Sequence, residues 1–345
     1  MDLWLVYRQM LRSRLFEEAV AVLWEHGLIS GEMHLGTGEE AIIAGVVLQL
    51  KDGDAMALDH RGTSALLMRG VDPYLLLREF LGQPDGLCKG MGGHMHLFAP
   101  ELQAASSGIV GASGPAAAGF ALASQYLRPG AVSVAFFGEG ATNQGMLLES
   151  LNLAAAWQLP VLFVCKDNAW EITTQFPSVS HGGLAERARG FGVTAVDVDG
   201  SNIEAVWEAA RQAIQRLRQG EGPTFMHASC VHLQGHFLGD QLLRLADDPF
   251  SEMKTTTLPM MRSFLRRRGA PLSVRVQGIR HAMTMISLAP ARKNIQKKDP
   301  LLAARMKLES YPEQLLELET AIQLEIQQVT ESALSSMLAQ EGNLS

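Results

Sequence analysis

The feature that most constrains the fold is a strand–turn–helix–strand pattern in residues 132–168. Residues 132–137 are mostly apolar and predict a buried strand, and residues 161–165 predict a second one. Between them, residues 143–157 predict a helix whose core face is formed by Met146, Leu147, Leu151, Ala154 and Ala155. This unit is typical of an open parallel sheet, in which ligands bind beyond the carboxyl ends of the strands.

Polar residues follow both predicted strands. Glu139 comes after the first strand, between Gly138 and Gly140, and Asn168 comes after the second. Carboxylate and amide oxygens suit Mg²⁺, which is usually shared with a phosphate. Backbone amides near Gly140 and Ala141 can donate to that phosphate. Spacing alone does not separate this interpretation from an ordinary strand–helix–strand unit with polar loops.

Composition narrows the class of protein. The chain has 345 residues, 47% hydrophobic and 19% charged, with a formal net charge of −7. A mildly acidic total argues against general nucleic-acid binding, and no apolar run reaches membrane-spanning length. Residues 2–26 predict an amphipathic helix and not a signal peptide. Cys88, Cys165 and Cys230 have no metal or redox spacing, so we expect a reducing, cytoplasmic compartment.

Residues 132–168 resemble the thiamine diphosphate motif of alpha subunits of 2-oxo acid and acetoin dehydrogenases. The matching residues are GEGATNQG at 138–145, then Glu149, Asn152, Ala154, Leu159, Pro160, Phe163 and Asn168. The resemblance implies that Glu139, Asn168 and the backbone carbonyl of Trp170 hold Mg²⁺. Two departures bear on this metal site: Glu139 replaces the family's Asp, and Asp167 replaces the first of two Asn residues.

Two earlier segments extend the resemblance. Residues 27–41 are similar to the family's HLxxGQEA element, with Glu39 in place of Gln, which puts His34 near the coenzyme diphosphate. A histidine that merely caps a turn is the alternative. The segment containing His60 and Arg61 resembles THRGHGH, so that Arg61 would clamp the diphosphate through its planar fork, with His60 beside it. Thr63 stands where the family has another histidine.

Two further segments complete the match. Residues 89–119 resemble KGKGGSMH…GIVG, with His94 replacing Ser, and the resemblance assigns backbone groups of Gly108 and Val110 to the aminopyrimidine ring. The segment CVHLQGHFLGDQ is similar to the loop that closes over the coenzyme. Its His236 matches a catalytic histidine that contacts reaction intermediates and assists acyl transfer. A surface histidine without a role is the alternative.

We predict an α/β fold, a doubly wound parallel sheet flanked by helices. Residues 1–245 are expected to form the thiamine diphosphate-binding domain, and residues 299–345 a helical segment packed on it or on a partner. Residues 246–298 form a basic insertion that is atypical of the family, with a possible short strand at 273–276 and an apolar helix at 281–288. A basic run is usually a solvated surface; docking of an acidic partner is the alternative.

The resemblance also implies the activity. It predicts an alpha subunit that binds thiamine diphosphate and Mg²⁺ and pairs with a beta subunit as α2β2. The complex would cleave a C–C bond next to a carbonyl, by acetoin cleavage or 2-oxo acid decarboxylation, and pass the activated aldehyde to a lipoyl acyltransferase. HRG at residues 60–62 and GHFLGD at 235–240 favour the acetoin branch. The departures from the family motif at Glu139, Asp167 and Thr63, together with the basic insertion, leave two alternatives open. The chain could be a specialised biosynthetic acyl or acyloin transferase, or a degenerate subunit kept for assembly.

Overall fold

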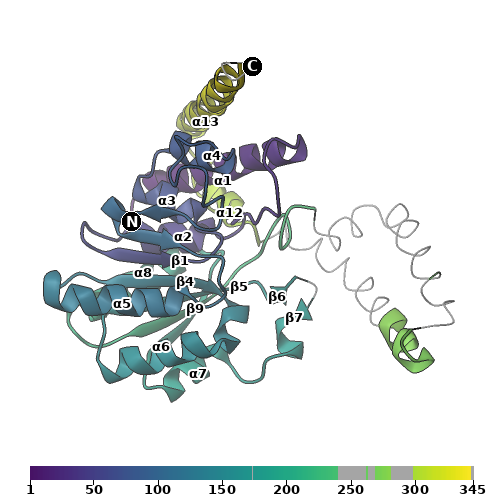
Figure 1. Cartoon of the computed structure of the whole chain (residues 1–345). Coiled ribbons are helices and arrows are strands. Elements are labelled where there is room, and N and C mark those ends of the chain that lie inside the picture. Colours follow the sequence, from purple (N-terminus) through teal and green to yellow (C-terminus); the bar gives the residue numbers. More distant parts are fainter. Residues whose placement is uncertain (173, 240–261, 263–268, 281–297, 343–345) are drawn as a thin grey trace.

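A seven-stranded sheet forms the centre of the molecule (Figure 1). The computed structural model describes residues 1–172, 174–239, 262, 269–280 and 298–342. The strand order is β2-β3-β1-β4-β5-β9-β8, and all neighbours are parallel except β2 and β3. The strands are β1 Ala55–Leu58, β2 Phe98–Ala99, β3 Ala104–Ser106, β4 Ser133–Gly138, β5 Val161–Asp167, β8 Thr194–Asp199 and β9 Thr224–Ser229.

Helices cover both faces of the sheet (Figure 1). One layer comprises α5 Ser113–Leu127, α6 Gly145–Ala156 and α7 Leu184–Gly190. The other comprises α1 Leu3–Glu25, α2 Glu40–Val47, α3 Thr63–Arg69, α4 Pro73–Phe80, α8 Ile203–Arg218, α12 Pro300–Met306 and α13 Pro312–Gly342. Successive strand residues alternate between these layers, so that Val134 and Phe136 face one core while Ala135 and Phe137 face the other. The predicted doubly wound fold is confirmed.

The connections reverse direction between β1 and β4. From β1 the chain continues to β3 on one side, whereas from β4 it continues to β5 on the other. The crevice beyond the carboxyl ends of such a pair is where open α/β sheets bind ligands. Here β1 leads into Asp59, His60 and Arg61, and β4 leads into Glu139. Glu139–Asn143 forms a short 3-10 turn before α6, and β6 Trp170–Glu171 and β7 Thr174–Gln175 form a small hairpin after β5.

Two local predictions were wrong. The 3-10 turn delays the start of α6 to Gly145, so Met146 lies in the first helical turn and is exposed, while Leu147 is buried. Residues 272–280 are helical where a strand was predicted at 273–276, and the Arg275 N–H donates to the Pro271 carbonyl at 3.2 Å, as in a helix. The predicted helix at 281–288 and the basic residues Arg266, Arg267, Arg268, Arg292, Lys293 and Lys297 lie outside the described residues.

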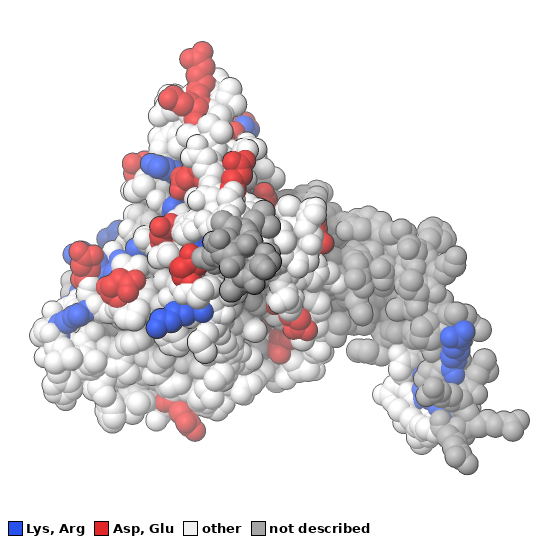
Figure 2. All heavy atoms as spheres, turned by 45° about the horizontal axis from the view of Figure 1, so that its top comes forward, with Lys and Arg blue, Asp and Glu red and all other residues white. Residues whose placement is uncertain are grey.

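A buried ion pair joins the C-terminal helices to the start of the chain. Arg14 on α1 donates two 3.0 Å hydrogen bonds to Asp299, which also caps α12, and another to Glu40. The predicted apolar face of α13 packs on α1 and α4 through Leu315, Ile322, Ala333 and Met337. Acidic side chains lie along the projecting part of α13 (Figure 2). The domain limits at residues 245 and 298 stay predictions.

None of the helices in the described ranges combines the length and the apolar character that crossing a bilayer requires.

Glu17 on α1 is an acidic group inside the core. Its side chain is buried, Oε2 has no hydrogen-bond partner among the described residues, and the Ser64 hydroxyl approaches Oε1 at only 3.4 Å. Burial, followed by the charge of Glu40, raises the pKa of Glu17 to about 8. The folded protein therefore holds this proton in a pH range where the unfolded chain has already released it.

We expect the free energy of unfolding to fall as pH rises from about 4.5 to about 8, because deprotonation of Glu17 penalises the folded state alone. The slope from this group is at most about 1.4 kcal/mol per pH unit. Urea unfolding across this range should show a steeper fall in the wild type than in Glu17→Gln, by up to this amount, because the other buried groups contribute equally to both profiles. The exposed Glu25→Gln, on the same helix, should keep the wild-type slope. Equal slopes in all three proteins would contradict the assignment.

Candidate functional site

A cavity of about 280 Å³ lies at the carboxyl ends of β1, β4 and β5. Ten of the residues predicted to form the site line it: His60, Arg61, Val110, Gly138, Glu139, Gly140, Ala141, Asn168, Trp170 and His236. They come from five separate segments of the chain. The fold therefore gathers nearly all the residues that the sequence motifs singled out.

Two predicted site residues, His34 and Gly108, do not line this cavity. His34 lies behind His60, with ring centroids 4.7 Å apart. Gly108 packs against its own loop, where an added Cβ would be 3.1 Å from Met95 Sδ and 3.3 Å from His96 Nε2. Its neighbour Val110 does reach the cavity. A larger residue at position 108 would therefore require the side chain of Met95 or His96 to shift.

Glu139 offers a buried carboxylate oxygen to the cavity. Its Oε2 accepts hydrogen bonds from Asn168 N at 3.3 Å and Nδ2 at 3.4 Å, while Oε1 is buried without a partner among the described residues. Burial, then the charge of Asp167, raises the pKa of Glu139 to about 8, although amides of Asn168 and Trp170 oppose this. A cation beside Oε1 would satisfy this oxygen and offset the repulsion.

Asp167 is held by groups other than Glu139. Its Oδ1 accepts from Ala169 N at 2.7 Å, and its Oδ2 lies 2.8 Å from His227 Nε2. The other ring nitrogen of His227 lies 2.7 Å from Asp197. The hydrogen bond to Asp167, despite burial, raises the pKa of His227. The aspartate at this departure from the family motif is therefore part of a local Asp–His–Asp chain.

A buried charge cluster forms part of the cavity wall. Lys166 Nζ lies 2.7 Å from Glu39 and 3.0 Å from Asp59, and His232 Nε2 lies 2.7 Å from Glu39. Burial alone would raise the pKa of Glu39, but Lys166 and His232 outweigh it and hold it at about 2. Burial likewise opposes the charge of Lys166, yet Asp59 and Glu39 raise its pKa. Sequence reasoning noted Glu39 only as a departure and missed its partners.

Arg61 ties two loops together at the edge of the cavity. One guanidinium nitrogen donates to the carbonyl of Leu35, and the other donates to the carbonyl of His236 at 2.6 Å. The side chain is buried. Arg61 therefore holds the backbone of the His236 loop beside the cavity while its cation faces the same space.

Comparisons with known proteins show which family the chain belongs to. Residues 8–269 match the family model described as the dehydrogenase E1 component, which is about three quarters of the chain. The chain belongs to the dehydrogenase E1 component family.

Named relatives come from two branches of this family. The chain is 43% identical over 237 residues to the alpha subunit of acetoin:2,6-dichlorophenolindophenol oxidoreductase of Cupriavidus necator, covering 68% of this chain and 71% of the relative. The corresponding Bacillus subtilis subunit is 42% identical over 240 residues, covering 69% and 72%. The pyruvate dehydrogenase E1 component subunit alpha of Zymomonas mobilis is 36% identical over 257 residues, covering 74% and 73%.

The family match includes every cavity-lining residue but not the C-terminal helices. Residues 298–342, with the Asp299 contact to Arg14, lie beyond its end at residue 269. Glu139, Asn168 and Arg61 lie within the matched part. The cluster around Lys166 is a feature that only the structure reveals.

The charge cluster yields a prediction. In Lys166→Met, Glu39 and Asp59 lose their buried counter-charge, so the free energy of unfolding should fall by about 3–5 kcal/mol. Adding Glu39→Gln removes one uncompensated carboxylate and should restore part of that loss, which urea unfolding of the single and double variants measures. Lys307→Met, which breaks a surface ion pair with Glu204, should change stability little. Purely additive losses in the double variant would contradict the coupling.

Proposed function

We propose that the chain is the alpha subunit of a thiamine diphosphate-dependent dehydrogenase. The observation that carries this proposal is the buried, unpartnered Oε1 of Glu139 beside Asn168, at the point where the sheet connections reverse. Membership of the E1 family and relatives named as acetoin and pyruvate dehydrogenase alpha subunits support it. The reaction is cleavage of a C–C bond next to a carbonyl in a small substrate.

The residues fit a hard metal ion. Glu139, Asn168 and the Trp170 carbonyl would hold Mg²⁺, which prefers such oxygen ligands and shares them with phosphate. The lone oxygen of Glu139 requires a cation or a donor, because a buried carboxylate without either is costly. Glycines 138 and 140 and Ala141 leave the backbone accessible at the 3-10 turn for phosphate oxygens.

The remaining cavity residues suit an anionic coenzyme tail. Arg61, His60 and His34 would contact the diphosphate, and Gly108 and Val110 the aminopyrimidine end. A cavity of about 280 Å³ is small for a whole coenzyme, because ligand pockets for drug-sized molecules span roughly 300–1,000 Å³. The other half of the site would come from a beta subunit in an α2β2 assembly.

The coenzyme supplies the nucleophilic carbon and the electron sink for C–C cleavage. This chain's part is to bind, orient and transfer protons. His236 is the catalytic candidate, because Arg61 holds its carbonyl and Ile172 N–H donates to its Nδ1 at 3.3 Å, which sets the ring at the cavity edge. From there it would exchange a proton with the substrate and meet the lipoyl group of an acyltransferase that accepts the acyl unit.

Acetoin is the favoured substrate over a 2-oxo acid. The acetoin-named relatives are 43% and 42% identical, against 36% for the pyruvate dehydrogenase subunit, and HRG at residues 60–62 agrees with that branch. Unpaired Cys88, Cys165 and Cys230 agree with a reducing, cytoplasmic compartment. A biosynthetic transferase or an assembly-only subunit is the alternative, favoured by Glu139, Thr63 and Asp167 at motif positions.

Calorimetric titration of the chain together with its beta subunit tests the proposal. We expect thiamine diphosphate to bind only with Mg²⁺ present, and Glu139→Gln to weaken this binding by more than about a hundredfold, because the metal loses its charged ligand. The matched variant Glu208→Gln, exposed on α8, should bind like the wild type. Absence of Mg²⁺-dependent binding in the wild-type complex would leave the assembly-only alternative.

A further inference from the structure

Three histidines from distant segments converge beside the cavity, which His60 and His236 line directly. His34, His60 and His236 each offer a ring nitrogen, and these atoms all lie within 4.8 Å of one another. Their ring centroids are 4.7, 5.3 and 6.3 Å apart. In a tetrahedral Zn²⁺ site with Zn–N bonds of about 2.1 Å, imidazole centroids lie roughly 5 Å apart. The spacings of His34 from His60 and from His236 match this geometry, whereas the His60–His236 pair is about 1 Å wider, so a bound ion would draw these two rings together.

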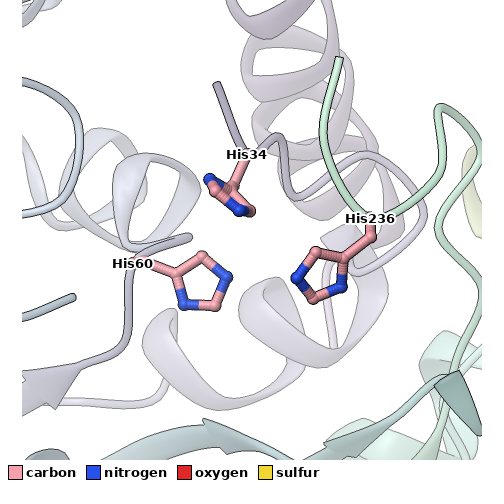
Figure 3. A group of neighbouring side chains, drawn as sticks. All are labelled: His34, His60 and His236. Atoms are coloured by element: carbon pink, nitrogen blue, oxygen red, sulfur yellow. The ribbon is translucent and has the colours of Figure 1, made fainter. Parts of the chain in front are cut away.

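The hydrogen bonds orient the rings for this role. The backbone N–H of His34 donates to His94 Nε2 at 3.3 Å, so His94 Nε2 acts as an acceptor. His34 Nδ1 also lies 3.3 Å from His94 Nε2, and a hydrogen bond between these two nitrogens therefore requires the proton on His34 Nδ1. The His34 lone pair is then on Nε2. His60 Nε2 is buried and has no partner among the described residues. Figure 3 shows nitrogens of His60 and His236 turned toward the space between the three rings.

The environment keeps these imidazoles neutral, which is the form that binds metal. Burial, then the charge of Arg61, lowers the pKa of His34 to about 3 and that of His94 to about 4, and lowers the pKa of His60 further. At neutral pH, no proton has to be removed from a cationic ring at His34 or His60. A bound ion would also give the buried His60 nitrogen the partner that it lacks.

We propose that His34, His60 and His236 form a binding site for a borderline divalent transition-metal ion, with Zn²⁺ the representative. His94 supports the site by fixing the His34 ring, as outer hydrogen-bond partners of metal-bound histidines do. Ligation by His236 Nε2 puts its ring proton on Nδ1 and replaces the 3.3 Å contact with Ile172 N–H. Three imidazoles leave a fourth position open.

This site differs from the Glu139 site in its chemistry. Imidazole nitrogens select Zn²⁺ and its neighbours, whereas Mg²⁺ takes oxygen ligands. A second convergent group, Glu39, Cys230 and His232, is a weaker competitor. Its Glu39 is already paired with Lys166 at 2.7 Å, and burial raises the pKa of the Cys230 thiol, which disfavours the thiolate needed for ligation.

A regulatory consequence rests on the proposed function. If His34, His60 and His236 contact the coenzyme, the same nitrogens cannot bind an ion at the same time. Zn²⁺ would then compete with thiamine diphosphate, and coenzyme would release the ion. Mg²⁺ would not displace Zn²⁺ by itself.

The experiment uses the metal-free full chain without coenzyme. Titration with Co²⁺ should give the visible absorption bands of a tetrahedral or five-coordinate complex, and calorimetry should give one Zn²⁺ per chain. His60→Ala and His236→Ala should each lower Zn²⁺ affinity by more than about a hundredfold, and His94→Ala by about 10–100-fold. The controls His26→Ala, an exposed histidine after α1, and Cys230→Ser should bind like the wild type.

The outcomes separate the alternatives. No Zn²⁺ binding, unchanged affinity in both His60→Ala and His236→Ala, or loss of binding in Cys230→Ser would each overturn the site. Thermal melts identify a misfolded variant, and His236→Ala in a surface loop remains decisive if His60→Ala does not fold. The coenzyme is added only afterwards, so failure of Zn²⁺ binding and failure of Mg²⁺-dependent coenzyme binding are observed separately.

Discussion

The parallel pairing of β4 with β5 and of β5 with β9 determines where the central polar groups of the cavity lie. Gly138 pairs with Lys166, and Lys166 pairs with Ala228, so the acidic turn and the Asp167-Asn168 pair leave the sheet side by side. Lys166 shares the face of Leu162 and Val164, toward the layer that carries α2 and Glu39. A slip of one residue would turn Lys166 to the opposite layer and leave Glu39 buried without its cation.

The sequence was sufficient for the architecture and for most of the residues that line the cavity. Apolar runs, glycine turns and the E1 motifs predicted adjacent strands β4 and β5 and the shared cavity of Arg61, Glu139 and Asn168. These features are local or carried by contiguous motifs. Their relative placement then follows from parallel pairing, which brings the carboxyl ends of the strands to one edge.

The cluster of Lys166, Glu39, Asp59 and His232 could not be predicted in the same way. Its members are separated by up to 193 residues, and each one alone resembles a motif departure or a stray charge. The lysine that directly follows the apolar run VLFVC was the only available signal, and its partner depends on which face of the sheet it occupies. The prediction that Met146 belongs to the core was wrong for a related reason. The apolar pattern does not reveal the 3-10 turn Glu139–Asn143, which moves the start of α6 to Gly145.

The chain between the cavity loop and α12 is anchored at both ends to the same N-terminal region. Leu238 N–H donates to the Met33 carbonyl at 2.8 Å, and Asp299 is gripped by Arg14. Because Leu238 and Asp299 are each fixed by their own contacts, a change in the length of the intervening sequence should leave both the cavity loop and α12 in place.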